Sequence, residues 1–231
     1  MLRYPCLTNL FLAAAVAGAG GFLAPAADAA YVTPKIGGAQ MTMADGTPMI
    51  HADIMFSNNN IDVTLDTSSG IPMLRPLVPP DEFDPALPWS VLNGKAYNYQ
   101  YAWNPGGYYV LPTGTAIWIE RLRQDAGLEV YLRPPASDTY APVFTADGGR
   151  FKWAGSMQHN AYAVKNPATD RYSAEYRIYI GNNDTVGNPV DGYGSDTVIL
   201  TWTATPAPEP ASLAMLAAGA VGLAIRRRSR A

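Results

Sequence analysis

The sequence predicts an all-β protein built as an antiparallel β-sandwich, with the jelly roll as one form that such a sandwich takes. In several segments apolar residues alternate with polar ones at the two-residue period of a half-buried strand. Glycine, proline and asparagine interrupt the chain about every eight to fifteen residues. No segment between residues 30 and 205 keeps the 3.6-residue apolar period of a helix over ten residues. Together these patterns favour short strands joined by turns.

The first predicted element is a hairpin. Residues 50–56 and 61–67 both have the composition of strands, and Ile61, Val63 and Leu65 alternate with polar neighbours in the second. The connection between them contains three asparagines, Asn58, Asn59 and Asn60. Asparagine tolerates the left-handed backbone angles of a tight turn, so the two strands are expected to pair directly.

Three later segments follow the same rule. Residues 115–122, 172–180 and 196–204 alternate between apolar and polar side chains, which predicts three more strands. Ahead of them, residues 72–88 hold six prolines. Proline lacks the backbone N–H that a β-ladder needs, so we expect a surface connection there whose apolar residues pack onto the sandwich.

Composition limits the possible functions. Residues 30–205 contain 11 Lys and Arg against 17 Asp and Glu, a net charge of −6, and they include no basic run. This acidic balance opposes nucleic-acid binding. The single cysteine, Cys6, lies ahead of the N-terminal apolar run, so the predicted mature domain contains none. We therefore expect no disulfide and no thiol nucleophile there, and a fold stabilised by core burial alone.

The N-terminal segment, residues 1–29, is typical of a secretory signal peptide. It carries Arg3 near its start, an apolar run over residues 7–23, and Ala27 and Ala29 at the two positions that a signal peptidase reads. We expect signal peptidase to cut after Ala29. The remaining domain, residues 30–205, would then be exported.

The C-terminal segment, residues 206–231, contains three elements in order. Pro208, Glu209 and Pro210 form a triplet, residues 211–225 carry no charge, and a basic tail follows that includes Arg226, Arg227 and Arg228. A helix over residues 211–225 would be roughly 22 Å long, which is shorter than the ~30 Å hydrocarbon core of a bilayer. Such a helix would serve as a provisional anchor, with the arginines on the cytoplasmic side.

This arrangement resembles the PEP-CTERM sorting signal of Gram-negative bacteria. The resemblance implies that the C-terminal helix holds the chain in the inner membrane until an exosortase recognises the Pro-Glu-Pro triplet and cuts nearby. It also implies a final place at the cell surface or outside the cell, where proteins of this class are associated with exopolysaccharide. The triplet is then a recognition element of a substrate and has no catalytic role.

Few residues could support catalysis. The chain has two histidines, no Gly-x-Ser-x-Gly elbow, and no glycine-rich phosphate loop between a strand and a helix. We therefore predict that the protein is not an enzyme and that it has no catalytic residue.

The two histidines are the candidate metal ligands. His51 and Asp53 share one face of the first predicted strand, and this mixture of imidazole and carboxylate suits Zn²⁺. If the strand that carries His159 lies beside it, the three side chains converge on one ion. The alternative is that both histidines are half-buried residues bonded to the backbone, or simple surface residues.

A second resemblance bears on this site. Residues 85–89, 92–98 and 159–164 are similar to segments of a PEP-CTERM subgroup that is repressed by the zinc-uptake regulator. Such regulation implies expression when zinc is scarce, and therefore a role in zinc binding, with His51 and His159 as the candidate ligands.

The densest aromatic stretch gives a different candidate site. Tyr97, Tyr99, Tyr101 and Trp103 fall on one face of a predicted strand, where an exposed stripe could stack on the sugar rings of an exopolysaccharide. The same stripe could equally be a central core strand, and the exposure of the four side chains separates the two interpretations. A non-enzymatic surface or matrix protein is thus the first hypothesis, zinc binding the second and carbohydrate binding the third.

Overall fold

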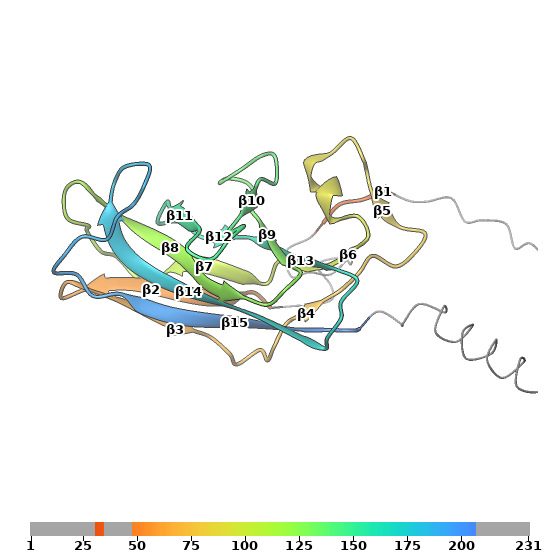
Figure 1. Cartoon of the computed structure of the whole chain (residues 1–231), viewed down its shortest axis with the longest axis horizontal. Coiled ribbons are helices and arrows are strands. Elements are labelled where there is room, and N and C mark those ends of the chain that lie inside the picture. The colour runs from red at the N-terminus through yellow and green to blue at the C-terminus, as the bar shows by residue number, and fades with distance from the viewer. Residues whose placement is uncertain (1–30, 35–47, 207–231) are drawn as a thin grey trace, which may run out of the picture.

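The computed structural model describes residues 31–34 and 48–206, which fold mainly into β-strands (Figure 1). The predicted all-β sandwich is confirmed. Sheet I has the strand order β11-β8-β14-β15-β4, sheet II the order β12-β7-β2-β3, and sheet III the order β10-β9-β13-β6. A short parallel pair, β1-β5, lies beside them.

The strands have the following bounds. Sheet I contains β4 (Met73–Leu74), β8 (Thr115–Gln124), β11 (Arg150–Trp153), β14 (Arg171–Asn182) and β15 (Asp196–Ala204). Sheet II contains β2 (Ile50–Ser57), β3 (Asn60–Leu65), β7 (Tyr101–Pro105) and β12 (Gln158–His159). Sheet III contains β6 (Lys95–Asn98), β9 (Leu128–Tyr131), β10 (Pro142–Val143) and β13 (Ala161–Lys165). The remaining elements are β1 (Tyr31–Val32), β5 (Glu82–Phe83) and a 3₁₀ turn, Pro88–Leu92.

The predicted hairpin is present as β2 and β3. Asn58 and Asn59 form its turn with φ angles of 51° and 59°, the left-handed values that asparagine tolerates. β15 has the predicted bounds, whereas β8 and β14 extend beyond theirs. Within sheets I to III, the pairing is antiparallel except between β2 and β7 and between β15 and β4. These two parallel pairs differ from the predicted antiparallel sandwich, and the long connections between their strands permit them.

The main core lies between sheet I on one side and sheets II and III on the other. Ile54 and Trp103 come from sheet II, Tyr162 from sheet III, and Tyr176 and Trp202 from sheet I, and each is at most 1 % exposed. Burial of so much apolar surface supplies the stability that a domain without disulfides requires.

A second core covers the opposite face of sheet III. The proline-rich connection and the 3₁₀ turn after it fold over this face, in yellow beside β6 in Figure 1, and place Phe83 and Leu92 there at 0 % exposure. The ring of Phe83 meets Tyr97 edge-on, with 5.5 Å between centroids. The expected packing of this connection is therefore confirmed, although Met73 and Leu87 remain exposed at its surface.

Two neighbouring segments run from one sheet into the next. β6 leads into β7 through Tyr99 and Gln100, and β12 leads into β13 through Asn160. The segments stay antiparallel across the passage, because β6 pairs with β13 and β7 pairs with β12. We call residues 98–100 and 158–160 the sheet crossing. It joins sheets II and III into one layer.

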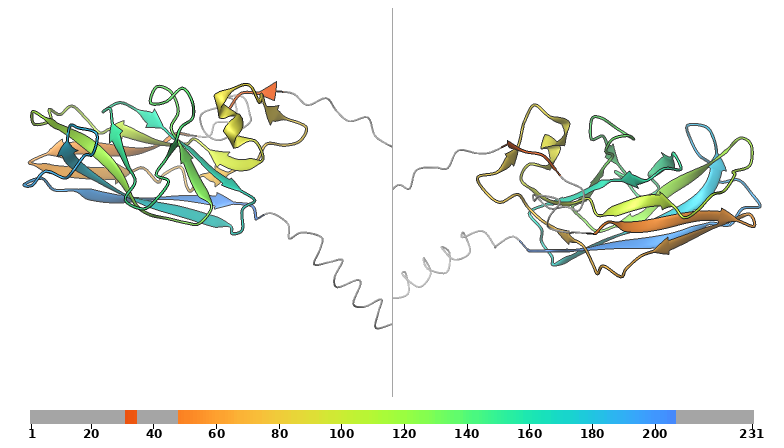
Figure 2. Two further views of the ribbon diagram at one scale, coloured as in Figure 1. Left: turned by 45° about the horizontal axis from the view of Figure 1, so that its top comes forward. Right: turned by 180° about the vertical axis from the view of Figure 1, so that it is seen from behind.

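The two ends of the described domain lie close to the same end of the molecule. β1 and the last residues of β15 point to one end, whereas the β2–β3 turn and the loop between β7 and β8 lie at the other (Figures 1 and 2).

Candidate functional site

The predicted aromatic stripe is buried. Tyr97 and Tyr99 are 0 % exposed, Tyr101 is 5 % exposed and Trp103 is 1 % exposed. Because the chain changes sheet after Tyr99, the first two rings belong to the second core and the last two to the main core. None of the four rings offers a face to a sugar. The structure supports the core interpretation and corrects the assignment of these residues to carbohydrate binding.

The sheet crossing contains a buried polar network that the sequence reasoning missed. Asn98 Nδ2 donates to the Met73 carbonyl at 3.0 Å and to Gln100 Oε1 at 2.8 Å, and the Gln100 N–H donates back to Asn98 Oδ1 at 2.8 Å. Gln158 Nε2 donates to the Arg133 carbonyl at 3.1 Å. Backbone groups that lose their ladder partners where the sheets part require such bonds. The sequence did carry one signal for this network, because amide residues alternate with aromatic residues in that stretch.

The two histidines face the same residue. His51 on β2 and His159 on β12 both pair with Ala102 on β7, which lies between them. Paired residues of a sheet project to the same face, so the three side chains form one row across sheet II. Two strand spacings separate the histidine Cα atoms, roughly 9–10 Å. In that row, only the methyl group of Ala102 stands between the two imidazoles.

The protonation of His159 follows from its partner. Its Nδ1 lies 2.7 Å from the Tyr99 carbonyl oxygen. A carbonyl oxygen can only accept, so Nδ1 carries the proton and the neutral ring has its lone pair on Nε2. Burial is the largest effect and lowers the pKa of His159; the hydrogen bond to the Tyr99 carbonyl acts in the opposite direction, and the positive charge of Arg133 adds to the lowering. The neutral, metal-competent form of the ring is therefore favoured.

Neither histidine uses its Nε2 within the part of the chain that the structure describes. Both Nε2 atoms are buried, and neither has a hydrogen-bond partner among residues 31–34 and 48–206. A buried polar atom without a partner is costly, and one explanation for it is an ion that the fold accommodates. The pair is thus the strongest candidate for a ligand site among the residues singled out from the sequence.

Asp53 does not join the two histidines. It pairs with Asn104, one row further along the sheet, and its Oδ1 accepts a hydrogen bond from Asn104 Nδ2 at 2.7 Å. Within the described ranges there is no group of three or more His, Cys, Asp or Glu side chains that could hold a metal ion. The structure therefore brings together His51 and His159 of the predicted set and leaves Asp53 bonded elsewhere.

The comparisons with known proteins concern the C-terminal segment. Residues 206–228 match the family model of the PEP-CTERM protein-sorting motif, and no curated protein and no solved structure matches the chain. The motif implies export, processing by an exosortase, and a C-terminus anchored in the membrane before that processing.

The residues predicted to direct export lie outside the described ranges. They are residues 1–29 of the signal peptide, the Pro208-Glu209-Pro210 triplet, the apolar segment 211–225 and the three arginines 226–228. Within the described ranges, no helix has both the length and the apolar character needed to cross a bilayer.

Proposed function

The chain carries the PEP-CTERM protein-sorting motif, and on this premise we propose that it is a non-enzymatic protein of the cell surface or extracellular matrix, delivered there by an exosortase. The main support for this proposal is the position at which the folded domain ends relative to the sorting motif. Ala204, which is 6 % exposed, is the last residue of β15, an interior strand of sheet I, and the motif begins at residue 206. A cut within the motif would remove no residue of either core, so the β-domain can be released intact.

The arrangement of the ends suits this role. Attachment after β15 would hold the opposite end of the domain away from the bilayer (Figure 2). The loop between β7 and β8 lies at that distant end, and its Tyr108 is 93 % exposed. Loops of this kind are where a rigid β-scaffold presents its contacts to partners.

Deletion of residues 212–230 tests the proposal. We expect the shortened chain to appear as soluble periplasmic protein with an unchanged β-sheet circular dichroism spectrum and melting temperature, because the described cores end at Ala204. The full-length chain, fractionated in parallel, should sediment with membranes until it is processed. An unfolded truncated protein would mean that the C-terminal segment belongs to the domain, which would contradict the proposal.

A second function, extracytoplasmic zinc binding, is favoured by the row of His51, Ala102 and His159. Two imidazoles on the strands that flank β7, each with a buried and unpartnered Nε2, can hold Zn²⁺ at nitrogen–metal distances of about 2.0–2.1 Å. Water molecules would complete the four-coordinate shell. The Tyr99 carbonyl supports the ligand by fixing the tautomer of His159.

Thermal unfolding of the full-length protein in mild detergent tests zinc binding. Zinc at a hundred times its Kd should add about 2.7 kcal/mol to the free energy of unfolding and raise Tm by roughly 5–10 °C relative to chelator. The shift should vanish in His51→Ala/His159→Ala. It should persist in Asp53→Asn, the matched control, because Asp53 is bonded to Asn104.

Calcium and direct zinc counting complete this test. Calcium prefers oxygen ligands, so it should leave Tm unchanged. Equilibrium dialysis of the unsubstituted protein should give one zinc per chain, a result that does not depend on the stability of any variant. No bound zinc, or an equal shift with calcium, would return both histidines to a structural role.

A further inference from the structure

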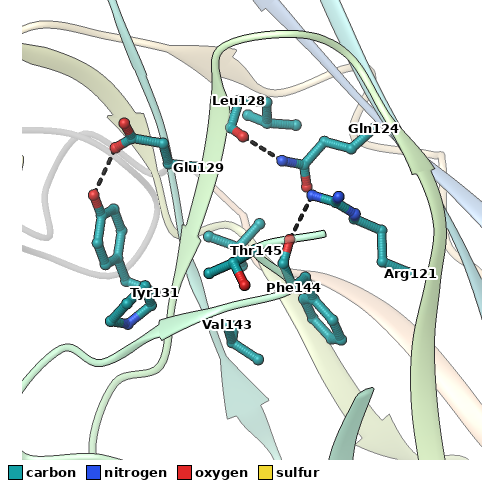
Figure 3. A pocket seen from close by; sticks show the side chains of 10 residues that line it. Arg121, Gln124, Leu128, Glu129, Tyr131, Val143, Phe144 and Thr145 are labelled. Carbon is teal, nitrogen blue, oxygen red and sulfur yellow. Dashed lines mark hydrogen bonds between the residues drawn. The ribbon is translucent and has the colours of Figure 1, made fainter. Parts of the chain in front are cut away.

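A cavity of about 290 Å³ lies beside Arg121, at the C-terminal end of β8 (Figure 3). Its unpartnered atoms, Arg121 Nε and Gln124 Oε1, are buried, and its apolar residues Leu128 and Val130 belong to the main core. These walls are not accessible to a ligand, so this cavity is a packing gap between strands. Another cavity, of about 260 Å³, lies along the edge of β15, and several of the residues that line it are exposed.

This second cavity is a cleft that forms where β3 and β15 separate. The two strands begin side by side and run in the same direction. Ile61 N–H donates to the Gly194 carbonyl at 3.2 Å, and Val63 N–H donates to Asp196 Oδ2 at 2.8 Å. A loop then leads from β3 to β4, which pairs with β15 only from Thr203 onward. We call the open space along β15 between these contacts the β15 cleft, and it is lined by Leu65, Asp66, Thr67, Gly70, Ile71, Tyr101, Arg171, Ile199 and Thr201.

The backbone of β15 has an unpaired position in this cleft. Alternate residues of a strand direct their N–H and C=O groups to the same edge. Thr203 N–H donates to the Pro72 carbonyl at the β4 edge, so Thr201 and Ile199 face that edge as well. The Tyr101 hydroxyl donates to the Thr201 carbonyl at 2.9 Å and accepts from Thr201 N–H at 3.4 Å. At Ile199 no strand among residues 31–34 and 48–206 pairs with this edge, so its backbone groups can pair with an added chain.

The side chains around this position are apolar and accessible. Ile199 is 47 % exposed and Ile71 is 46 % exposed, and both line the cleft. The half-buried Leu65 lines it as well. A chain that pairs with β15 at Ile199 would remove part of this apolar surface from water, which stabilises a complex.

Arg171 supplies a free positive charge to the cleft. It is the first residue of β14 and pairs with Thr203, toward the C-terminal end of β15. Among the described residues it forms no ion pair, so its guanidinium can bind a carboxylate. Asp66 also lines the cleft, and hydrogen bonds from Ser68 lower the pKa of Asp66 and keep it ionised. A ligand with several negative charges is therefore disfavoured.

We propose that the β15 cleft binds a short extended segment of another exported protein, which pairs with β15 at Ile199 and directs a carboxylate to Arg171. Since β3 and β15 run in parallel, a segment parallel to both brings its carboxyl end toward Arg171. Main-chain bonds then supply affinity, and the apolar walls select its side chains. The volume of the cleft, below the ~300–1,000 Å³ range of small-molecule sites, limits the segment to a few residues. The proposal rests on the proposed surface role only in that other exported chains reach the domain there.

Fluorescence anisotropy with the full-length protein in mild detergent tests this site. The probes are three tetrapeptides, Thr-Val-Thr-Val, Ser-Leu-Ser-Leu and Thr-Phe-Thr-Phe, each with a dye at the N-terminus and a free C-terminal carboxylate. We expect at least one of them to bind saturably. Its C-terminal amide should bind about tenfold more weakly, because it loses the charge-assisted bond to Arg171. N-methylation of its two central residues should weaken binding at least tenfold, because it removes the N–H groups that pair with β15.

Three variants locate the bound peptide. Arg171→Gln should weaken binding of the carboxylate peptide about tenfold and leave the amide peptide unaffected, a difference that a merely structural effect would not produce. Ile199→Ala should weaken both peptides several-fold, because it removes an apolar wall. Arg123→Gln is the matched control, because Arg123 is paired with Glu175 and does not line the cleft, and it should change neither affinity.

Several results would overturn the proposal. They are failure of all three peptides to bind, full affinity of the N-methylated peptide, and an equal loss of the carboxylate and amide peptides in Arg171→Gln. Displacement of the labelled peptide by hexanoate as effectively as by the unlabelled peptide would also overturn it, since that would indicate a carboxylate site without strand pairing. None of these results depends on sorting, so the surface role is tested separately.

Discussion

Replacing Glu209 with alanine is expected to leave the protein in the inner membrane. Glu209 carries the only charge of the Pro-Glu-Pro triplet within the matched motif. We expect the exosortase to pair a positive group with this carboxylate when it recognises the triplet. Loss of one partner from such a desolvated charge pair costs about 2–5 kcal/mol, which corresponds to processing slowed by roughly 30-fold or more.

Cell fractionation with an epitope tag on the β-domain measures this result. The Glu209→Ala protein should accumulate in the membrane fraction at its unprocessed length, while the unsubstituted protein appears processed outside that fraction. Ser212→Ala is the matched control, because it lies just beyond the triplet and should be processed normally. Normal release of the Glu209→Ala protein would remove the basis for exosortase sorting.

Replacing Trp202 with alanine is expected to have the largest effect on stability. Trp202 is 0 % exposed on β15, where its ring lies 5.2 Å from Tyr101 and 4.4 Å from Tyr162 between centroids. A Trp-to-Ala change in a packed core costs about 3–5 kcal/mol, a large part of the 5–15 kcal/mol typical of a whole domain. The indole Nε1 has no hydrogen-bond partner among the described residues, so its removal orphans no polar group there.

Thermal unfolding checks this expectation. For a domain of this size the loss corresponds to a Tm lower by roughly 6–20 °C. Ile199→Ala is the matched control, because Ile199 lies on the same strand but is 47 % exposed, and its loss should cost about 0.5 kcal/mol or less. A Tm change of similar size in both variants would mean that the core does not lie between the sheets as described.

Alternation and turn residues were sufficient to predict an element when all of the residues that determine it lie in one short segment. The β2–β3 hairpin depends on alternation in two adjacent strands and on two asparagines that tolerate positive φ, all within residues 50–65. β15 depends on alternation alone, and its predicted bounds were those observed. The same rules failed for the aromatic stripe. Period two places Tyr97 to Trp103 on one face, but it cannot reveal that the chain changes sheet within that stretch or that a distant proline-rich segment covers it.

The candidate sites show the same division. Two residues of the predicted metal site, His51 and His159, lie on either side of Ala102 in one row of sheet II, although they are far apart in the sequence. The exclusion of Asp53 depends on Asn104, a neighbour on another strand that no spacing rule identifies. The β15 cleft has no sequence signature, because it is formed where strands of different sheets separate.

The sequence by itself determined that this is an all-β protein with a C-terminal sorting motif, because strand alternation and the order of triplet, apolar segment and basic tail are local properties of the chain. Only the tertiary structure decided which side chains are free to meet a ligand. Burial, strand neighbours and the space between sheets depend on contacts among residues far apart in sequence. Those contacts buried four aromatic rings, aligned two histidines and left an open cleft along β15.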